Sequence, residues 1–138
     1  MTDDVDYIVI VQCHIVKERC SGFLCEQAFR ERAGGFAEYP KDKPIRFLSI
    51  TCGGCCGKAT LRKLTHLIRL ATKAGIEKDR ILVQLSSCMT KDNFHSPRCP
   101  HTDYIKQLVA RAGLRCREDT RISPTAEQRR RDGVYRTH

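Results

Sequence analysis

Three short apolar runs, each followed by a segment with helical periodicity, constrain the fold of this chain more than any other feature. The runs cover residues 7–11, 45–50 and 81–85 and are rich in β-branched residues. The first has no polar residue, which is typical of a strand that helices cover on both faces. Because strands that alternate with helices pair in parallel through crossover connections, we predict an open, mainly parallel, doubly wound α/β sheet.

The spacing of apolar residues also predicts three helices. They cover residues 23–33, 61–71 and 102–112, and a glycine follows shortly after each of them. Thr102 is the expected N-cap of the third helix, because a threonine hydroxyl can accept a hydrogen bond from the free N–H groups of the first turn.

The chain after Gly113 supplies the remaining elements. Residues 114–117 fit a fourth strand, 126–131 a short helix and 134–138 a last strand. The predicted fold is therefore Rossmann-like or flavodoxin-like, with a sheet of four or five strands and helices on both faces. With 138 residues the chain has the length of one compact domain, so we assign residues 1–138 to a single domain.

Composition narrows the cellular setting and the partners. No stretch approaches the roughly 20 consecutive apolar residues of a membrane helix, and the N-terminus is acidic where a secretory signal is basic. We therefore expect a cytoplasmic protein with no membrane association. The net charge of +9 would suit an acidic partner, nucleic acid or a cluster of thiolates. We do not expect nucleic-acid binding, because aromatic residues make up only 7% of the chain and no known reading module fits. A protein partner stays undetermined.

Nine cysteines in a chain without an export signal indicate metal or thiol chemistry, since a reducing compartment disfavours a disulfide scaffold. Cys13, Cys52 and Cys88 each come just after a predicted strand. The carboxyl ends of parallel strands share one edge of a sheet, where ligands bind. Neighbouring strands are about 4.8 Å apart, which is compatible with the roughly 3.8 Å between thiolates around one zinc ion. We therefore predict that these cysteines converge on a metal site.

The second strand leads into residues 52–58, with the sequence CGGCCGK. A C-x-x-C pair can bind one ion because the chain turns between its sulfurs, and glycines permit the positive backbone angles of such a turn. Cys55 and Cys56 are expected near a helix N-terminus, where free N–H groups and the helix dipole lower a thiol pKa. The same turn could hold an anion, although it lacks the Walker spacing. Its candidate cofactor-binding residues are Gly53, Gly54, Gly57 and Lys58.

A further ligand-like pair follows the third strand. Cys99 and His101 place a soft sulfur and an imidazole on either side of a proline. Cys20 and Cys25, at the start of the first helix, are weaker candidates that could simply pack that helix. His14, beside Cys13, stays ambiguous, and we expect structural roles for His66 and Cys116.

Taken together, these residues resemble the CGGC-domain family over nearly the whole chain. The pattern has a cysteine after the first strand, two cysteines ahead of Gly35-Phe36, C-G-G-C-x-G-K after the second strand, and Ser-Cys after the third. It ends with Cys-Pro-His and with Thr137-His138 near the C-terminus. The resemblance implies metal binding, with zinc the usual metal, and implies no particular reaction. One departure is Cys56, which stands where similar sequences often have proline and is a ligand, a redox partner or a bystander.

The leading hypothesis is therefore a protein that binds a metal ion, with zinc as the expected cofactor. The candidate ligands outnumber those of one tetrahedral zinc, so some are spare or more than one ion is bound. They are Cys13, Cys52, Cys55, Cys88, Cys99, His101 and His138.

Two alternatives use the same thiols differently. An iron–sulfur cluster would make the protein an electron carrier or a redox sensor, but the cysteine spacings match no ferredoxin pattern. The segment from Cys56 to Arg62 also satisfies C-x₅-R, the loop pattern of phosphatases and arsenate reductases. This reading ranks lower because the predicted helix begins before Arg62 and Lys63 replaces the usual serine or threonine. Whether the protein is an enzyme is left open.

Overall fold

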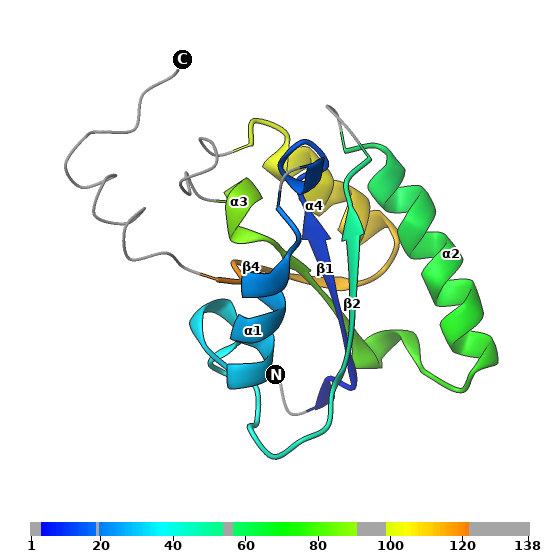
Figure 1. The fold of residues 1–138 in the computed structure, drawn as a ribbon. Coiled ribbons are helices and arrows are strands. Elements are labelled where there is room, and N and C mark those ends of the chain that lie inside the picture. The colour runs from blue at the N-terminus through cyan, green and yellow to red at the C-terminus, as the bar shows by residue number, and fades with distance from the viewer. Residues whose placement is uncertain (1–3, 19, 54–56, 91–98, 122–138) are drawn as a thin grey trace.

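The computed structural model describes residues 4–18, 20–53, 57–90 and 99–121, which form an open sheet of four parallel strands between helices (Figure 1). The strand order β2-β1-β3-β4 is that of the first four strands of the flavodoxin-like arrangement. The predicted α/β fold is therefore confirmed. Along the chain the elements are β1 (Tyr7–Gln12), η2 (Val16–Glu18), α1 (Phe23–Glu31), η3 (Gly34–Phe36), β2 (Arg46–Thr51), α2 (Ala59–Lys73), η4 (Lys78–Arg80), β3 (Ile81–Leu85), α3 (Ser87–Thr90), α4 (Thr102–Arg111) and β4 (Arg115–Glu118).

The burial of each strand follows from its position in the sheet. β1 and β3 lie at the centre, and all their residues are buried, as their continuous apolar runs predict. β2 and β4 lie at the edges of the described sheet, and they are only partly covered. This edge position explains how β2 accommodates Arg46 and Ser49 as exposed residues within a strand.

Helices cover the two faces of the sheet unequally. α1 packs on one face together with Phe36 and Tyr39, and we refer to this side as the α1 face. α2 and α4 cover the opposite side, the α2–α4 face (Figure 1). Along β1, Ile8 and Ile10 point to the α1 face, whereas Val9 and Val11 point to the α2–α4 face. This alternation decides on which side each residue after the strand lies.

The end of α1 differs from the prediction. We expected the helix to reach residue 33, but it ends at Glu31, and Arg32 adopts a left-handed conformation with φ of 54°. The Arg32 guanidinium donates hydrogen bonds to the carbonyl of Phe29 at 2.6 Å and to that of Lys43 at 3.0 Å. These contacts stabilise a conformation that a non-glycine residue seldom adopts.

The region around α4 also differs from the prediction. Thr102 is not the N-cap: α4 begins at Thr102 itself and His101 holds the cap position. The Thr102 hydroxyl donates backward to the carbonyls of Cys99 at 2.8 Å and Met89 at 3.2 Å, so it does not accept from the helix. The short helix α3 was not predicted, because four residues are too few for a periodic pattern.

Some of the other predicted helices and strands are confirmed, and others lie outside the described residues. α2 begins at Ala59, directly after the CGGCCGK segment, and β4 confirms the fourth strand. The helix and fifth strand predicted after residue 121 lie outside the described residues. Within the described parts of the chain, every helix is too short or too polar to cross a membrane.

Candidate functional site

Cys13 and Cys52 lie next to each other at the carboxyl ends of β1 and β2. The register of these strands ends with Gln12 opposite Thr51, and the N–H of Cys52 still donates to the carbonyl of Gln12 at 3.1 Å. The two cysteines therefore continue the ladder by one step, at the strand spacing of about 4.8 Å. Both pack against the core on the α2–α4 face, so their side chains share one side of the sheet.

Cys88 reaches the same place from α3. Beyond the end of β3, the N–H of Ser86 donates to the carbonyl of Val11 at 2.9 Å, which keeps the chain beside β1. The backbone N–H of Cys13 is near enough to the Cys88 sulfur to lower the pKa of its thiol, and the Ser86 hydroxyl lies 3.0 Å from that sulfur. Burial raises the pKa of Cys88 to about 11, so this side chain is a neutral thiol at neutral pH.

Cys99 joins from the segment that precedes α4. Its N–H donates to the carbonyl of Met89 at 2.8 Å, which fixes the residue against α3. Burial raises the pKa of Cys99, and the N–H of His101, 3.4 Å from the sulfur, partly offsets this rise. The proximity of Cys13 and Cys52 raises the pKa of Cys99 further.

We call Cys13, Cys52, Cys88 and Cys99 the rim cysteines. They come from four separate segments and belong to, or pack against, one hydrophobic core. Among the described residues, no three histidine, cysteine, aspartate or glutamate side chains are arranged so that they could hold a metal ion. The donor chemistry suits a soft metal, but in this structure the thiols pack as small apolar groups. A metal would have to displace their protons and draw the sulfurs together.

The turn after β2 requires glycine at its two described glycine positions. Gly53 has φ of 85°, and a Cβ on it would lie 2.3 Å from the Cβ of Ala59. Gly57 has φ of 69°, and a Cβ on it would lie 2.5 Å from Cγ1 of Ile105 and 3.7 Å from the Cβ of Cys52. The predicted positive backbone angles are therefore present, and the turn brings α2 and α4 close to the strand end.

Of the remaining predicted site residues, the structure describes some and not others. Lys58 is exposed at the N-cap of α2, and its side chain makes no capping hydrogen bond. His101 is half-buried at the N-cap of α4, two residues after Cys99. Four residues of interest, Gly54, Cys55, Cys56 and His138, lie outside the described residues.

The other described cysteines lie outside the rim group, although Cys25 is near enough to Cys88 to raise the pKa of that thiol. Cys20 packs against the core of the α2–α4 face. Cys25 packs on the α1 face, where its sulfur lies 3.2 Å from the hydroxyl of Thr120. Cys116 lies within β4, and burial raises its pKa to about 11. Its position agrees with the expected structural role.

A cation that the sequence analysis did not single out lies beside the rim cysteines. The ammonium of Lys63 donates to the carbonyl of Thr51 at 2.9 Å and to its hydroxyl at 3.1 Å, one residue before Cys52. His14 is 3.2 Å from the same hydroxyl. The available signal was the position of Lys63 three residues after Thr60, because residues at this spacing lie on the same side of a helix.

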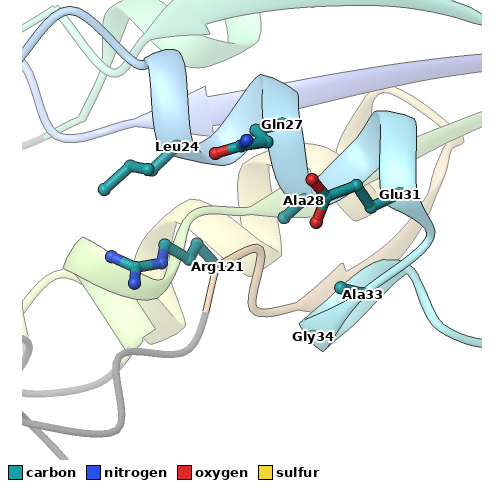
Figure 2. Close-up of a pocket in the computed structure, with 7 residues that line it drawn as sticks. All are labelled: Leu24, Gln27, Ala28, Glu31, Ala33, Gly34 and Arg121. Carbon is teal, nitrogen blue, oxygen red and sulfur yellow. The ribbon is translucent and has the colours of Figure 1, made fainter.

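Two cavities lie apart from the cysteines. Figure 2 shows a small one of about 130 Å³, where Glu31 of α1 and Arg121 beyond β4 line the space beside Gly34. A larger apolar groove of about 520 Å³ lies between β2 and α2, and Arg62 is one of its lining residues. Since Arg62 lies within α2, the segment from Cys56 to Arg62 includes the first turn of that helix.

Comparison with known proteins gives one match. The model of the CGGC domain family matches residues 7–121, which include all four strands and all four rim cysteines. Neither the curated proteins nor the solved structures contain a match to the chain.

Proposed function

Because the chain belongs to the CGGC domain family, we propose that it binds a soft transition-metal ion, preferentially zinc, through cysteines at the carboxyl end of its sheet. The observation that supports this proposal is the convergence of the rim cysteines. Cys13 and Cys52 are adjacent in register, Cys88 lies near the backbone N–H of Cys13, and Cys99 is near enough to Cys13 and Cys52 for them to raise its pKa. Four sulfurs from distant parts of the chain are a donor set that zinc accepts.

The surroundings also suit a cluster of thiolates. A zinc ion with four thiolate ligands carries a net charge of about −2, which nearby cations and N–H groups stabilise. Lys63 holds a positive charge one residue from Cys52. The N–H of His101 already donates to the sulfur of Cys99, and the N–H of Cys13 lies near the sulfur of Cys88. Bound zinc would join four segments and add its binding free energy to folding. Cys55, His101 and His138 remain candidate ligands.

The direct test is metal analysis of protein purified without chelator under reducing conditions. We expect about one equivalent of zinc per chain, the stoichiometry of a single tetrahedral site. Cys52→Ser should lose most of the metal because it removes a rim sulfur. Cys116→Ser is the matched control, since it removes a half-buried sulfur within β4, and it should retain the metal. Wild-type protein that stays metal-free after incubation with zinc would overturn the proposal.

An iron–sulfur cluster is the second candidate, because four cysteines are also its usual ligand set. The rim cysteines supply that number from the described residues alone. Absorption separates the two candidates, since a zinc site is colourless whereas a cluster absorbs visible light. If the anaerobically purified protein contains iron and sulfide and absorbs visible light, the bound group is an iron–sulfur cluster and not zinc.

A further inference from the structure

A cavity of about 350 Å³ lies on the α1 face, where β1 and β2 end and α1 begins. It is separate from the rim cysteines, because the alternation along β1 directs Gln12 to the α1 face and Cys13 to the opposite face. Its volume is at the lower end of the range for small-molecule sites. The lining residues used below are Gln12, Lys17, Gly22, Phe23, Glu26 and Phe47.

Gln12 is the unusual residue of this cavity. Its side chain is only 2% exposed, and its Oε1 accepts no hydrogen bond from the described residues. A buried polar atom without a partner costs about 1–3 kcal/mol. Because Gln12 also lines the cavity, this unpartnered atom points to a ligand that carries an N–H or O–H donor.

The cation of the cavity lies beside this amide. A Cβ on Gly22 would lie 3.0 Å from Nε2 of Gln12 and 3.0 Å from Nζ of Lys17, so both groups converge on Gly22. The Lys17 ammonium donates to the carbonyl of Ser21 at 2.9 Å, which holds it at this position. Within the described part of the chain this is its one hydrogen bond, which leaves other N–H donors for an anion.

The start of α1 adds to the attraction for an anion. Gly22 is the N-cap of this nine-residue helix and has no side chain to cap it; the hydroxyl of the preceding Ser21 accepts from the N–H of Phe23 at 3.2 Å. The N-terminal N–H groups and the helix dipole favour negative charge at this position. Lys17 and the helix therefore both attract the negative end of a ligand.

The cavity also carries a negative charge and apolar walls. Glu26, in the first turn of α1, lines it, so a ligand with only negative charge would be repelled on that side. Phe47 and the 61% exposed ring of Phe23 supply apolar surface. We propose that this cavity binds a small apolar α-amino acid. Its carboxylate contacts Lys17 and the start of α1, its ammonium donates to Oε1 of Gln12 and faces Glu26, and its side chain packs on the two rings.

Calorimetric titration with L-leucine tests the proposal, with two analogues that each lack one charged group. 4-Methylpentanoate lacks the ammonium, and 3-methylbutylamine lacks the carboxylate. We expect saturable binding of leucine and at least about tenfold weaker binding of each analogue, because a charge-assisted hydrogen bond contributes about 1.5–3 kcal/mol. Absence of leucine binding, or equal binding of leucine and 4-methylpentanoate, would overturn the proposal.

Substitutions of single residues test whether leucine binds in this cavity. Lys17→Met should weaken leucine binding at least about fivefold, since it removes a charged donor from a half-buried side chain. Lys73→Met, an exposed lysine in the last turn of α2, is the control and should leave binding unchanged. Equal affinities in these two variants would show that leucine binds elsewhere. Cys52→Ser should leave leucine binding intact while it lowers zinc content, so the two proposals fail independently.

Discussion

The α1 face buries two glutamines at the strands' carboxyl halves, whereas the α2–α4 face has cysteines at the corresponding end. Gln84 is fully satisfied: it accepts from the Tyr39 hydroxyl at 2.8 Å and donates to the carbonyls of Gly35 at 2.7 Å and Asp119 at 2.6 Å. Gln12 has an unpartnered Oε1. Burial raises the pKa of Tyr39 to about 12, so its hydroxyl keeps the proton that it donates. Completed hydrogen bonds thus mark a structural glutamine, and an incomplete set marks a candidate binding residue.

The largest loss of stability is expected when the hydrogen bonds of Gln84 are removed. Gln84→Leu should lower the free energy of unfolding by about 3 kcal/mol, because it leaves a buried hydroxyl and two carbonyls with one partner fewer. Gln12→Leu should not lower it and should raise it by up to about 3 kcal/mol, since it removes a buried atom whose missing partner costs about 1–3 kcal/mol. Urea denaturation of both variants measures the difference. Equal losses would contradict the distinction between the two glutamines.

The next prediction concerns the cysteine face and rests on zinc binding. At a free zinc concentration about 100 times the Kd, the bound ion should contribute about 2.7 kcal/mol to unfolding free energy. Removal of the ion by a chelator should therefore lower the Tm of the wild type. Thermal unfolding of Cys13→Ser should respond little to the chelator. A variant as sensitive as the wild type would exclude Cys13 as a ligand.

The turn between Cys52 and α2 offers a smaller effect. Gly57→Ala should cost about 2–3 kcal/mol, because it combines left-handed backbone strain with a contact of 2.5 Å to Ile105. Gly75→Ala is the matched control: φ is 88°, but no atom lies within 4 Å of the added Cβ. It should cost only about 1 kcal/mol. Chemical denaturation of both would reveal the packing contribution, and equal costs would show that Ile105 moves aside.

The smallest effect lies at the amino end of the sheet, far from both candidate sites. Hydrogen bonds from Arg80 and Lys43 lower the pKa of Asp6 below 3.8. Asp6 should therefore stabilise the protein above about pH 4, and the contribution should vanish as the pH falls through the lowered pKa. Because this carboxylate is 46% exposed, Asp6→Asn should cost only about 0.5 kcal/mol at pH 7. Unfolding measured at pH 7 and pH 2 checks this, and an equal loss at both values would contradict it.

Much of the fold was predictable because its strands and longer helices have local patterns. The apolar runs predicted β1 and β3 to within one residue, and the glycines predicted the turn after β2. The predicted N-cap of α4 was wrong because the Thr102 hydroxyl donates to the carbonyls of Met89 and Cys99. A local sequence pattern does not reveal these contacts. The early end of α1 depends likewise on contacts of Arg32 with carbonyls up to eleven residues away.

The candidate site was predictable in part. The position of Cys13, Cys52 and Cys88 after strands indicated one edge of the sheet, since parallel strands end on the same side. The contribution of Lys63 and the link of Cys99 to Met89 were not predicted, because they depend on how α2 and α3 pack. Gln12 carries no local signal of its own, since a glutamine at a strand end is equally consistent with an exposed residue.

The sequence by itself determined the alternation of strands and helices, the glycine turn and the clustering of cysteines after strands, because each depends on a few neighbouring residues. The tertiary structure alone decided which face each side chain occupies and which polar groups are satisfied. Alternation along the strands places Gln12 on one face and Cys13 and Cys52 on the other, and the pairing of β1 with β2 sets these two cysteines side by side. Such pairing joins residues far apart in the chain, so local composition does not specify it.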